Sequence, residues 1–283
     1  MIQRNLIILM LFMFMELNLN AQDITVVSYN IRLDVASDSL NRWDNRKDFL
    51  IGQLNFHGPD VFGIQEGLLH QLEEIKQGMP GYKYLGKGRE DGLKKGEFSA
   101  IFYNTEELEL LEENTFWLSE TPQVPSKGWD AAIKRVCTYG LFKVKGGAQK
   151  FWVFNTHFDH RGEEARKESA LLIMERIQEL NMQNLPVILT GDLNLEPNHP
   201  SILLLSSVMQ DSHLLAGEKA FGPEGTFNGF NFSEPITRRI DYIFLSKTGF
   251  QLIKYAILSD SKDLRYPSDH FPVLTKLSIT EKE

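Results

Sequence analysis

Short runs of β-branched and aromatic residues recur along the chain and are separated by polar segments, which is the pattern of strands in a folded domain. We predict strands at Ile24–Tyr29, Val61–Gln65, Ser99–Tyr103, Arg135–Val144, Phe151–Thr156, Val187–Thr190, Asp241–Leu245 and Phe271–Leu277. The apolar runs at 151–154 and 187–189 are continuous rather than alternating. Continuous runs indicate strands that are buried on both faces.

Between these strands, some segments place apolar residues three or four positions apart, which is the spacing of an amphipathic helix. These segments are Arg42–Phe56, Leu68–Lys76 and Glu163–Leu180. Strands buried on both faces need a second sheet on one side and helices on the other. The pattern therefore favours an α/β fold in which two sheets pack together between outer layers of helices, rather than one doubly wound sheet.

The first 21 residues follow a different pattern. Arg4 precedes an apolar run at 6–15, and the small residue Ala21 precedes a polar start. This is typical of a secretory signal peptide, so we expect a signal peptide at 1–21 and a periplasmic or secreted mature protein. A buried N-terminal helix is the alternative. No later stretch approaches the roughly 18 apolar residues of a membrane-spanning helix, so we expect no stable membrane insertion.

The rest of the chain contains no repeat, low-complexity tract or long linker, so we expect residues 22–283 to form a single domain that is monomeric. Lys and Arg number 30 against 38 Asp and Glu, which gives a net charge of −8. Such a chain lacks the broad positive field that drives nonspecific binding to nucleic acid. Cys137 is the only cysteine, so no intramolecular disulfide can form.

Polar side chains stand where the predicted strands end or begin. They are Asn30, Glu66, His157, Asp192, Asn194, Asp241, Asp269 and His270. One such residue is usually a turn or cap residue, but strand ends on one rim of a sandwich converge, and the cluster would repel itself without a cation. Because it is rich in oxygen ligands and contains no Cys, the cluster suits Mg²⁺ or Mn²⁺ better than Zn²⁺. The chemistry indicated is hydrolysis of a phosphoester.

Seven motifs occur in order along nearly the whole mature chain: SYN (28–30), IQE (64–66), EFSAIFY (97–103), NTHFDH (155–160), GDLN (191–194), RIDYIF (239–244) and SDHFPV (268–273). Together they resemble the motif series of the endonuclease/exonuclease/phosphatase superfamily, which includes pancreatic deoxyribonuclease and neutral sphingomyelinases. The resemblance implies the DNase I-like fold, a four-layered α/β/β/α sandwich of two mixed β-sheets flanked by helices. It also implies a divalent-metal-dependent phosphoester hydrolase.

The resemblance further implies roles for the matching positions. Glu66 would be the main metal ligand, helped by Asp269 and, through water, by Asn30. Asp192 would orient or deprotonate the attacking water, and Asn194 would form a hydrogen bond with the phosphate or with that water.

Two histidines would stabilise the phosphoryl transition state, each held by an acidic partner. Asp241 would pair with His270, and Glu97 would pair with His157. Because adjacent side chains on an extended backbone point to opposite sides, Asp269 would face the metal while His270 faces the scissile phosphate.

Two further segments predict contacts with the substrate. Arg135 stands at a strand start and is suited to bidentate binding of phosphate; a surface ion pair is the alternative. The loop at 225–239 carries Phe227, Phe230 and Phe232. They could form an aromatic wall beside the leaving group, for which Phe230 is our candidate contact, or a hydrophobic plug beneath the loop.

The substrate stays open at this point. The negative charge and the lack of long basic runs favour a small or lipid-linked phosphoester, with nucleic acid as the alternative. A secreted nuclease, a sphingomyelinase-like phospholipase and a catalytically silent binding module of the same fold are the competing functions. A zinc hydrolase of a different fold is disfavoured because the chain has no H-x-x-x-H motif.

Overall fold

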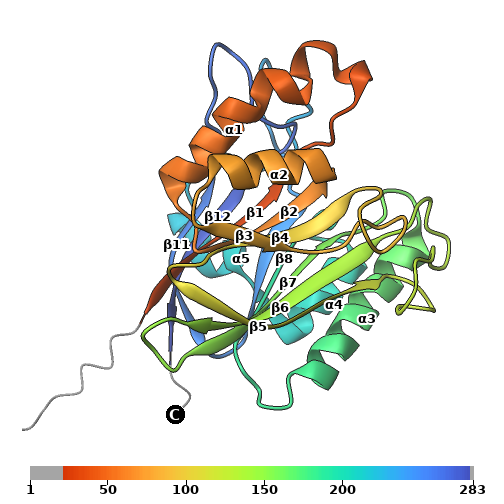
Figure 1. The fold of residues 1–283 in the computed structure, drawn as a ribbon, viewed down its shortest axis with the longest axis vertical. Coiled ribbons are helices and arrows are strands. Elements are labelled where there is room, and N and C mark those ends of the chain that lie inside the picture. Colours follow the sequence, from red (N-terminus) through yellow and green to blue (C-terminus); the bar gives the residue numbers. More distant parts are fainter. Residues whose placement is uncertain (1–21, 281–283) are drawn as a thin grey trace, which may run out of the picture.

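The computed structural model describes residues 22–280, so the predicted signal peptide at 1–21 lies outside the described residues. Two six-stranded sheets pack face to face, and helices cover their outer faces (Figure 1). This is the predicted four-layered α/β/β/α sandwich of two mixed sheets, and the fold prediction is confirmed. Within residues 22–280, no helix combines the length and the apolar character that crossing a bilayer requires.

The first sheet has the strand order β11-β12-β1-β2-β4-β3. Its strands are β1 (Asp23–Asn30), β2 (Val61–Gly67), β3 (Tyr82–Leu85), β4 (Phe98–Asn104), β11 (Phe250–Ile257) and β12 (Val273–Ile279). β1 and β2 run parallel, and the other neighbours are antiparallel. A parallel pair needs a crossover connection, which α1 (Trp43–His57) supplies.

The second sheet has the strand order β5-β6-β7-β8-β10-β9. Its strands are β5 (Leu108–Trp117), β6 (Val136–Val144), β7 (Lys150–His157), β8 (Val187–Asp192), β9 (Met209–Asp211) and β10 (Asp241–Ser246). β7 and β8 are its parallel pair, joined through α3 (Glu163–Leu180). Each sheet therefore has one pair of strands that end at the same edge.

Apolar side chains fill the space between the sheets and beneath the helices. The layer between the sheets includes Val26, Val61, Val153, Ile188 and Ile243. α1 and α2 (Leu69–Gly78) pack on the first sheet through Leu50, Leu54, Leu72 and Ile75. α3 and α4 (Pro200–Val208) pack on the second through Ala170, Ile173, Ile202 and Leu205. The short helices η1 (Ala36–Asn41), α5 (Ser212–Ala216) and η2 (Gly217–Lys219) lie in the connections.

Near one rim, the contact between the sheets changes from apolar to polar. The side-chain nitrogen of Asn155 donates to the carbonyl oxygens of Ile64 and Ala100, both at 2.8 Å. Its side-chain oxygen accepts hydrogen bonds from Gln65 at 2.7 Å and from Thr190 at 3.0 Å. These bonds join β7 and β8 to β2 and β4, and they fix the ends of the strands that carry the polar residues.

All the predicted strands and helices are present, with ends displaced by at most two residues. The strands that we did not predict are β3, β5, β9 and β11, which form the outer edges of the two sheets. The helices α4 and α5 were also missed.

Candidate active site

The predicted polar residues meet at one rim of the sandwich. In the second sheet, His157 at the end of β7 pairs in register with Asp192 at the end of β8, and Asp192 pairs with Asp241 at the start of β10. In the first sheet, Asn30 ends β1 and Glu66 lies close to the end of β2. The two parallel pairs thus bring together residues that are far apart in the sequence.

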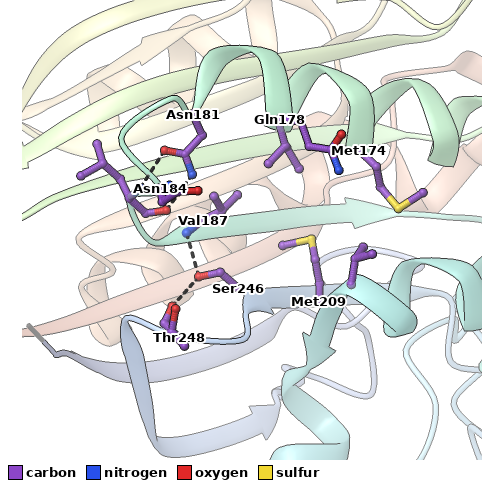
Figure 2. Close-up of a pocket in the computed structure, with 11 residues that line it drawn as sticks. Met174, Gln178, Asn181, Asn184, Val187, Met209, Ser246 and Thr248 are labelled. Atoms are coloured by element: carbon purple, nitrogen blue, oxygen red, sulfur yellow. Dashed lines mark hydrogen bonds between the residues drawn. The ribbon is translucent and has the colours of Figure 1, made fainter. Parts of the chain in front are cut away.

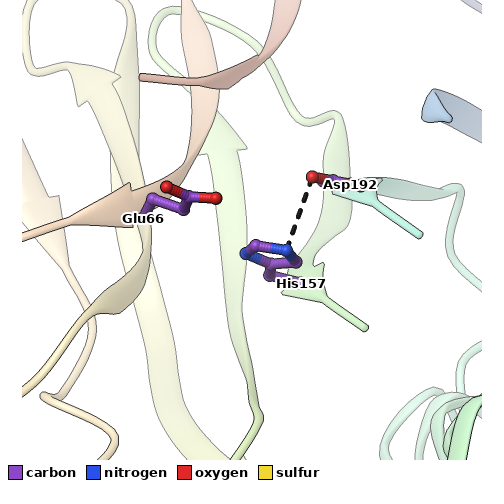
Figure 3. Close-up of side chains that lie close together, drawn as sticks. All are labelled: Glu66, His157 and Asp192. Carbon is purple, nitrogen blue, oxygen red and sulfur yellow. Dashed lines mark ion pairs between the residues drawn. The ribbon is translucent and has the colours of Figure 1, made fainter. Parts of the chain in front are cut away.

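The backbone around Glu66 aims its carboxylate into the cleft. The pairing of β2 with β4 shifts between Ile64 and Gly67, which is a β-bulge, and Glu66 has a φ of 64°. A bulge re-aims a side chain, and a left-handed backbone outside glycine costs on the order of 1 kcal/mol. Figure 3 shows Glu66 pointing toward His157 and Asp192.

Asn30 links two of the carboxylates. Its Nδ2 atom donates to Oε1 of Glu66 at 3.1 Å and to Oδ2 of Asp192 at 2.9 Å. Its Oδ1 atom accepts a hydrogen bond from the backbone nitrogen of Arg32 at 3.0 Å. Asn30 is therefore a hydrogen-bond donor that fixes the carboxylates of Glu66 and Asp192.

Arg32, which we did not predict, lies between two of the predicted metal ligands, Glu66 and Asp269. Its Nη1 atom is 3.9 Å from Oε2 of Glu66, and its Nε atom is 3.8 Å from Oδ2 of Asp269. Burial raises the pKa of Asp269, and His270 and Arg32 oppose that rise. The only signal for Arg32 in the sequence is its place two residues after Asn30.

His270 and Asp241 form the predicted pair. Nδ1 of His270 is 2.8 Å from Oδ2 of Asp241, and its Nε2 is 3.8 Å from Oδ2 of Asp192. Burial lowers the pKa of His270, but the two carboxylates outweigh burial and raise this pKa to about 10. His270 is therefore cationic at neutral pH.

Asp269 and His270 lie against different partners, as adjacent side chains on an extended backbone do, and their facing a metal and a phosphate stays a prediction. Asp269 faces Arg32 whereas His270 faces Asp241 and Asp192. β12 begins only at Val273. His270 instead forms an isolated antiparallel bridge with Phe227.

His157 contacts Asn194 and Asp192. Its Nε2 atom is 2.9 Å from Nδ2 of Asn194 and 3.4 Å from Oδ2 of Asp192 (Figure 3). Burial, reinforced by Arg135, holds the pKa of His157 well below its usual value. A neutral His157 accepts the hydrogen bond from Asn194. Burial and the neighbouring Asp241 raise the pKa of Asp192.

The contacts of Glu97 differ from our prediction. Its carboxylate forms two hydrogen bonds with Arg89, at 2.8 and 2.5 Å. Among the described residues, Nδ1 of His157 has no hydrogen-bond partner. Glu97 lines the cleft, but it is the partner of Arg89 because the loop before β4 brings that guanidinium against it.

Arg135 is buried beside the cleft, with 4% of its surface exposed. Its Nε atom is 3.5 Å from Oδ2 of Asp159, and its Nη2 atom is 3.1 Å from Nδ1 of His160. Its Nη1 atom has no hydrogen-bond partner among the described residues. Buried polar groups are rarely left unpaired, so this nitrogen fits an anionic ligand. His160, which we had left out of the site, also lines the cleft.

Phe227, and not Phe230, is the aromatic residue of the cleft. The Phe227 ring meets the His270 ring edge-on, with centroids 5.1 Å apart, and lines the cleft together with Arg238. Phe230 has a φ of 58° and lies 6.0 Å from the guanidinium of Arg46. Phe230 does not line the cleft, so the structure favours Phe227 over the predicted Phe230 as the aromatic contact.

Most of the site residues line a cleft of about 350 Å³, with Asn30 and Asp241 behind them in contact with its lining residues. A second hollow, of about 260 Å³, lies between the end of α3 and the end of β10 and is lined by residues such as Met174, Asn181 and Ser246 (Figure 2). None of the residues that line this hollow is acidic, basic or a histidine. Of these two hollows, the cleft at the rim is therefore the one that offers groups for proton transfer or for binding a cation.

Two groups within the described residues could hold a metal ion: Glu66 with His157 and Asp192, and Asp192 with Asp241 and His270. In each group, one ligand atom per residue lies within 4.8 Å of the others. Nδ1 of His270 is already engaged by Asp241, and Nε2 of His157 is engaged by Asn194. The carboxylate oxygens of Glu66 and Asp269, which line the same cleft, fit a hard cation.

Comparison with known structures gives close matches over most of the chain. An endonuclease/exonuclease/phosphatase family protein from Bacteroides thetaiotaomicron is 43% identical with a TM-score of 0.87, over 92% of this chain and 99% of that chain. A mannosyl-6-phosphatase from the same species is 44% identical with a TM-score of 0.85, over 90% of this chain and 100% of that chain. The human nocturnin catalytic domain, at 20% identity and a TM-score of 0.73, shares the fold.

Among curated sequences, an uncharacterized protein of Acanthamoeba polyphaga mimivirus is 34% identical over 163 residues, which are 55% of this chain and 60% of that protein. The match thus spans less than two thirds of the curated relative. The profile of the Endonuclease/Exonuclease/phosphatase family matches residues 27–270. Nucleases and phosphatases both hydrolyse phosphoesters, and the cleft has groups suited to that reaction. This chain belongs to the endonuclease/exonuclease/phosphatase family.

Proposed function

We propose that the protein hydrolyses a phosphate monoester of a small molecule with the help of a divalent cation, after export from the cytoplasm. One observation carries the proposal: across a single cleft, carboxylates suited to a cation face the buried Arg135, whose Nη1 atom has no partner among the described residues. A phosphoryl group is negatively charged and has several acceptor oxygens. It can therefore bind both the cation that the carboxylates hold and the guanidinium of Arg135.

Glu66 and Asp269 would hold Mg²⁺ or Mn²⁺, since hard cations prefer carboxylate oxygens. Asn30 would position Glu66 through the 3.1 Å hydrogen bond between Nδ2 and Oε1. When bound, such a cation polarises a phosphoryl oxygen and stabilises the leaving oxygen.

Asp192 would orient the attacking water and take its proton. Its carboxylate is fixed by Nδ2 of Asn30 and by the backbone nitrogen of Asn194, both at 2.9 Å. Burial and Asp241 raise the pKa of Asp192, which moves it toward the range where a general base works best near neutral pH.

The remaining groups would bind the phosphoryl oxygens as charge develops on them. His270 is a cation held by Asp241 at 2.8 Å, and Arg135 lines the same cleft with an Nη1 atom that has no hydrogen-bond partner among the described residues. Asn194 and the neutral His157 complete this side of the cleft. Preorganised donors of this kind lower the barrier because they need no rearrangement during the reaction.

The similarity to a mannosyl-6-phosphatase, at 44% identity over 90% of this chain, supports a sugar phosphate as the substrate. The net charge of −8 also favours a small substrate, because the protein surface outside the cleft would repel a long polyanion. The apolar segment at 6–15, preceded by Arg4, supports export through a cleaved signal peptide.

The test is phosphate release by the purified mature chain from mannose 6-phosphate in the presence of Mg²⁺ or Mn²⁺. A diaryl phosphodiester, sphingomyelin and duplex DNA serve as comparison substrates, followed through the released phenol, phosphocholine and shorter DNA because cleaving a diester releases no inorganic phosphate. Asp192→Asn is the inactive control. EDTA should abolish the reaction and added metal should restore it. Activity that resists chelators would refute the metal requirement, and faster cleavage of DNA or of the diester would refute the proposed substrate class.

A further inference from the structure

The guanidinium of Arg32 lies among three carboxylates at the edge of the cleft. Its Nε and Nη2 atoms form hydrogen bonds with the two oxygens of Asp38, both at 2.9 Å. The same group approaches Glu66 at 3.9 Å and Asp269 at 3.8 Å. Asp38 is therefore the hydrogen-bond partner of Arg32. Glu66 and Asp269, the two proposed cation ligands, interact with the same guanidinium at longer range.

The backbone fixes Arg32 at this place. Its φ is 56°, its amide donates to Asn30 at 3.0 Å, and its carbonyl oxygen accepts hydrogen bonds from Arg46 at 2.6 Å and Gln71 at 3.0 Å. A left-handed backbone outside glycine persists only where its surroundings hold it. The main chain is thus anchored on both sides, whereas the side chain lines the cleft and is 29% exposed.

We propose that Arg32 is the resident counter-cation of the cleft, a positioning residue that neutralises Glu66 and Asp269 until a divalent cation binds, and that Asp38 holds its guanidinium back from them. The inference rests on the proposed function, because it takes Glu66 and Asp269 as the cation ligands. A guanidinium and a divalent cation on the same two carboxylates repel each other, so Arg32 must yield these contacts when the cation binds.

Asp38 is suited to hold Arg32 during that change. The two parallel hydrogen bonds between a carboxylate and a guanidinium are strong and fix its orientation. Asp38 stands on η1, a short helix with no buried residue, so this element can follow Arg32 without disturbing the core. Asp38 therefore aids cation binding although it is not a ligand.

Two neighbouring substitutions should then have opposite effects on cation affinity. Arg32→Ala removes the competitor and should tighten Mn²⁺ binding. Asp38→Asn releases the guanidinium onto Glu66 and Asp269 and should weaken it. Because Asp38 acts through Arg32, Asp38→Asn should leave the Mn²⁺ affinity unchanged in a chain that already carries Arg32→Ala.

The experiment is titration calorimetry of Mn²⁺ into the purified chain without substrate, for the wild type, both single variants and the double variant. We expect changes of about tenfold in Kd for the single variants, in opposite directions, and equal Kd values for Arg32→Ala and the double variant. Arg42→Ala is the matched control: Arg42 belongs to the same segment, but its ion pair is with Asp34 at 3.3 Å. Its Kd should stay at the wild-type value.

The outcomes separate this inference from the proposed function. If Asp38→Asn weakens binding equally with and without Arg32, Asp38 is a simple negative charge and the inference is overturned while the cation site stands. If the wild type binds no Mn²⁺, or if Glu66→Gln leaves binding intact, the proposed cation site fails and the inference fails with it. Circular dichroism of each variant excludes unfolding as the cause of a lost titration.

Discussion

Oδ2 of Asp241 lies 2.8 Å from Nδ1 of His270, and both side chains are buried. The carboxylate begins β10, and the imidazole belongs to the segment before β12, so the pair joins the two sheets at the rim of the cleft. Burial alone would leave the imidazole neutral. Asp241 and Asp192 reverse that preference and raise the pKa of His270 to about 10.

This pair predicts a pH dependence of stability. Because the folded pKa of His270 is raised, the folded state binds its proton more tightly than the unfolded chain. The resulting stabilisation is fully present below the unfolded pKa of roughly 6.5 and is lost as the pH rises through about 10. Within that window, the pair should contribute a slope on the order of 1 kcal/mol per pH unit.

Asp241→Asn tests the slope. The free energy of unfolding, measured with urea at several pH values in the presence of EDTA, should be lower for the variant at neutral pH. The difference from the wild type should shrink steadily as the pH approaches 10. A difference that stays constant across this range would mean that His270 is not held as a cation.

Asp192 should be needed for activity but not for stability. Burial and Asp241 raise the pKa of its carboxyl group, so the folded state disfavours the charge that catalysis requires. Asp192→Asn keeps the shape and removes the charge. We expect phosphate release to fall about a thousandfold, with a melting temperature, in metal-free buffer, equal to or above that of the wild type. A large drop in melting temperature would indicate a structural role instead.

The interior of each sheet could be predicted from the sequence, and the edges could not. Interior strands such as Val187–Asp192 are apolar runs because both faces are buried. The edge strand β5 reads LELLEENTFW, with Glu112 and Glu113 exposed, so its local composition does not indicate a strand. The contacts across its one neighbour, β6, decide its conformation, and these are not visible in the local sequence.

The same distinction applies to the site. Asp192 and His157 could be found because each is the last residue of a buried strand, so its position is set by the sheet. The place of Arg32 depends on a left-handed backbone, and the pairing of Glu97 with Arg89 depends on the path of a loop. No local pattern of residues predicts either one. Which of Phe227 and Phe230 lines the cleft depends on the turn between them, and the local sequence does not reveal it.

That turn leads to a test of the aromatic contact. Phe227 lines the cleft and meets the His270 ring at 5.1 Å, whereas Phe230 lies by Arg46. Phe227→Ala should lower kcat/KM by about tenfold, since losing a packing contact worth about 1.4 kcal/mol in the transition state has that effect. Phe230→Ala is the matched control and should stay within about twofold of the wild type. Equal losses in both variants would contradict the assignment.

The polar contact between the sheets should dominate stability near the rim. Asn155 is fully buried and has four hydrogen bonds, two of them to backbone oxygens of the opposite sheet. Asn155→Ala removes the hydrogen-bond donor of those two oxygens and leaves the side chain of Gln65 with only its longer, 3.3 Å hydrogen bond to Ser28. Because each unsatisfied buried group costs about 1–3 kcal/mol, we expect the free energy of unfolding to fall by about 3 kcal/mol or more. Urea denaturation measures the change.

The exposed Asn45, whose Nδ2 donates to the carbonyl oxygen of Leu40 at 3.1 Å, provides the control. Asn45→Ala should change the free energy of unfolding by less than about 0.5 kcal/mol, as is usual for a surface substitution.

Cation binding at the rim should depend on Asn155 as well, because Asn155 fixes β2 beside β7 and therefore Glu66 beside His157. Asn155→Ala should thus weaken Mn²⁺ binding under conditions where it is still folded. Unchanged affinity together with lost stability would mean that the bulge at Glu66 holds the ligand without help from the opposite sheet.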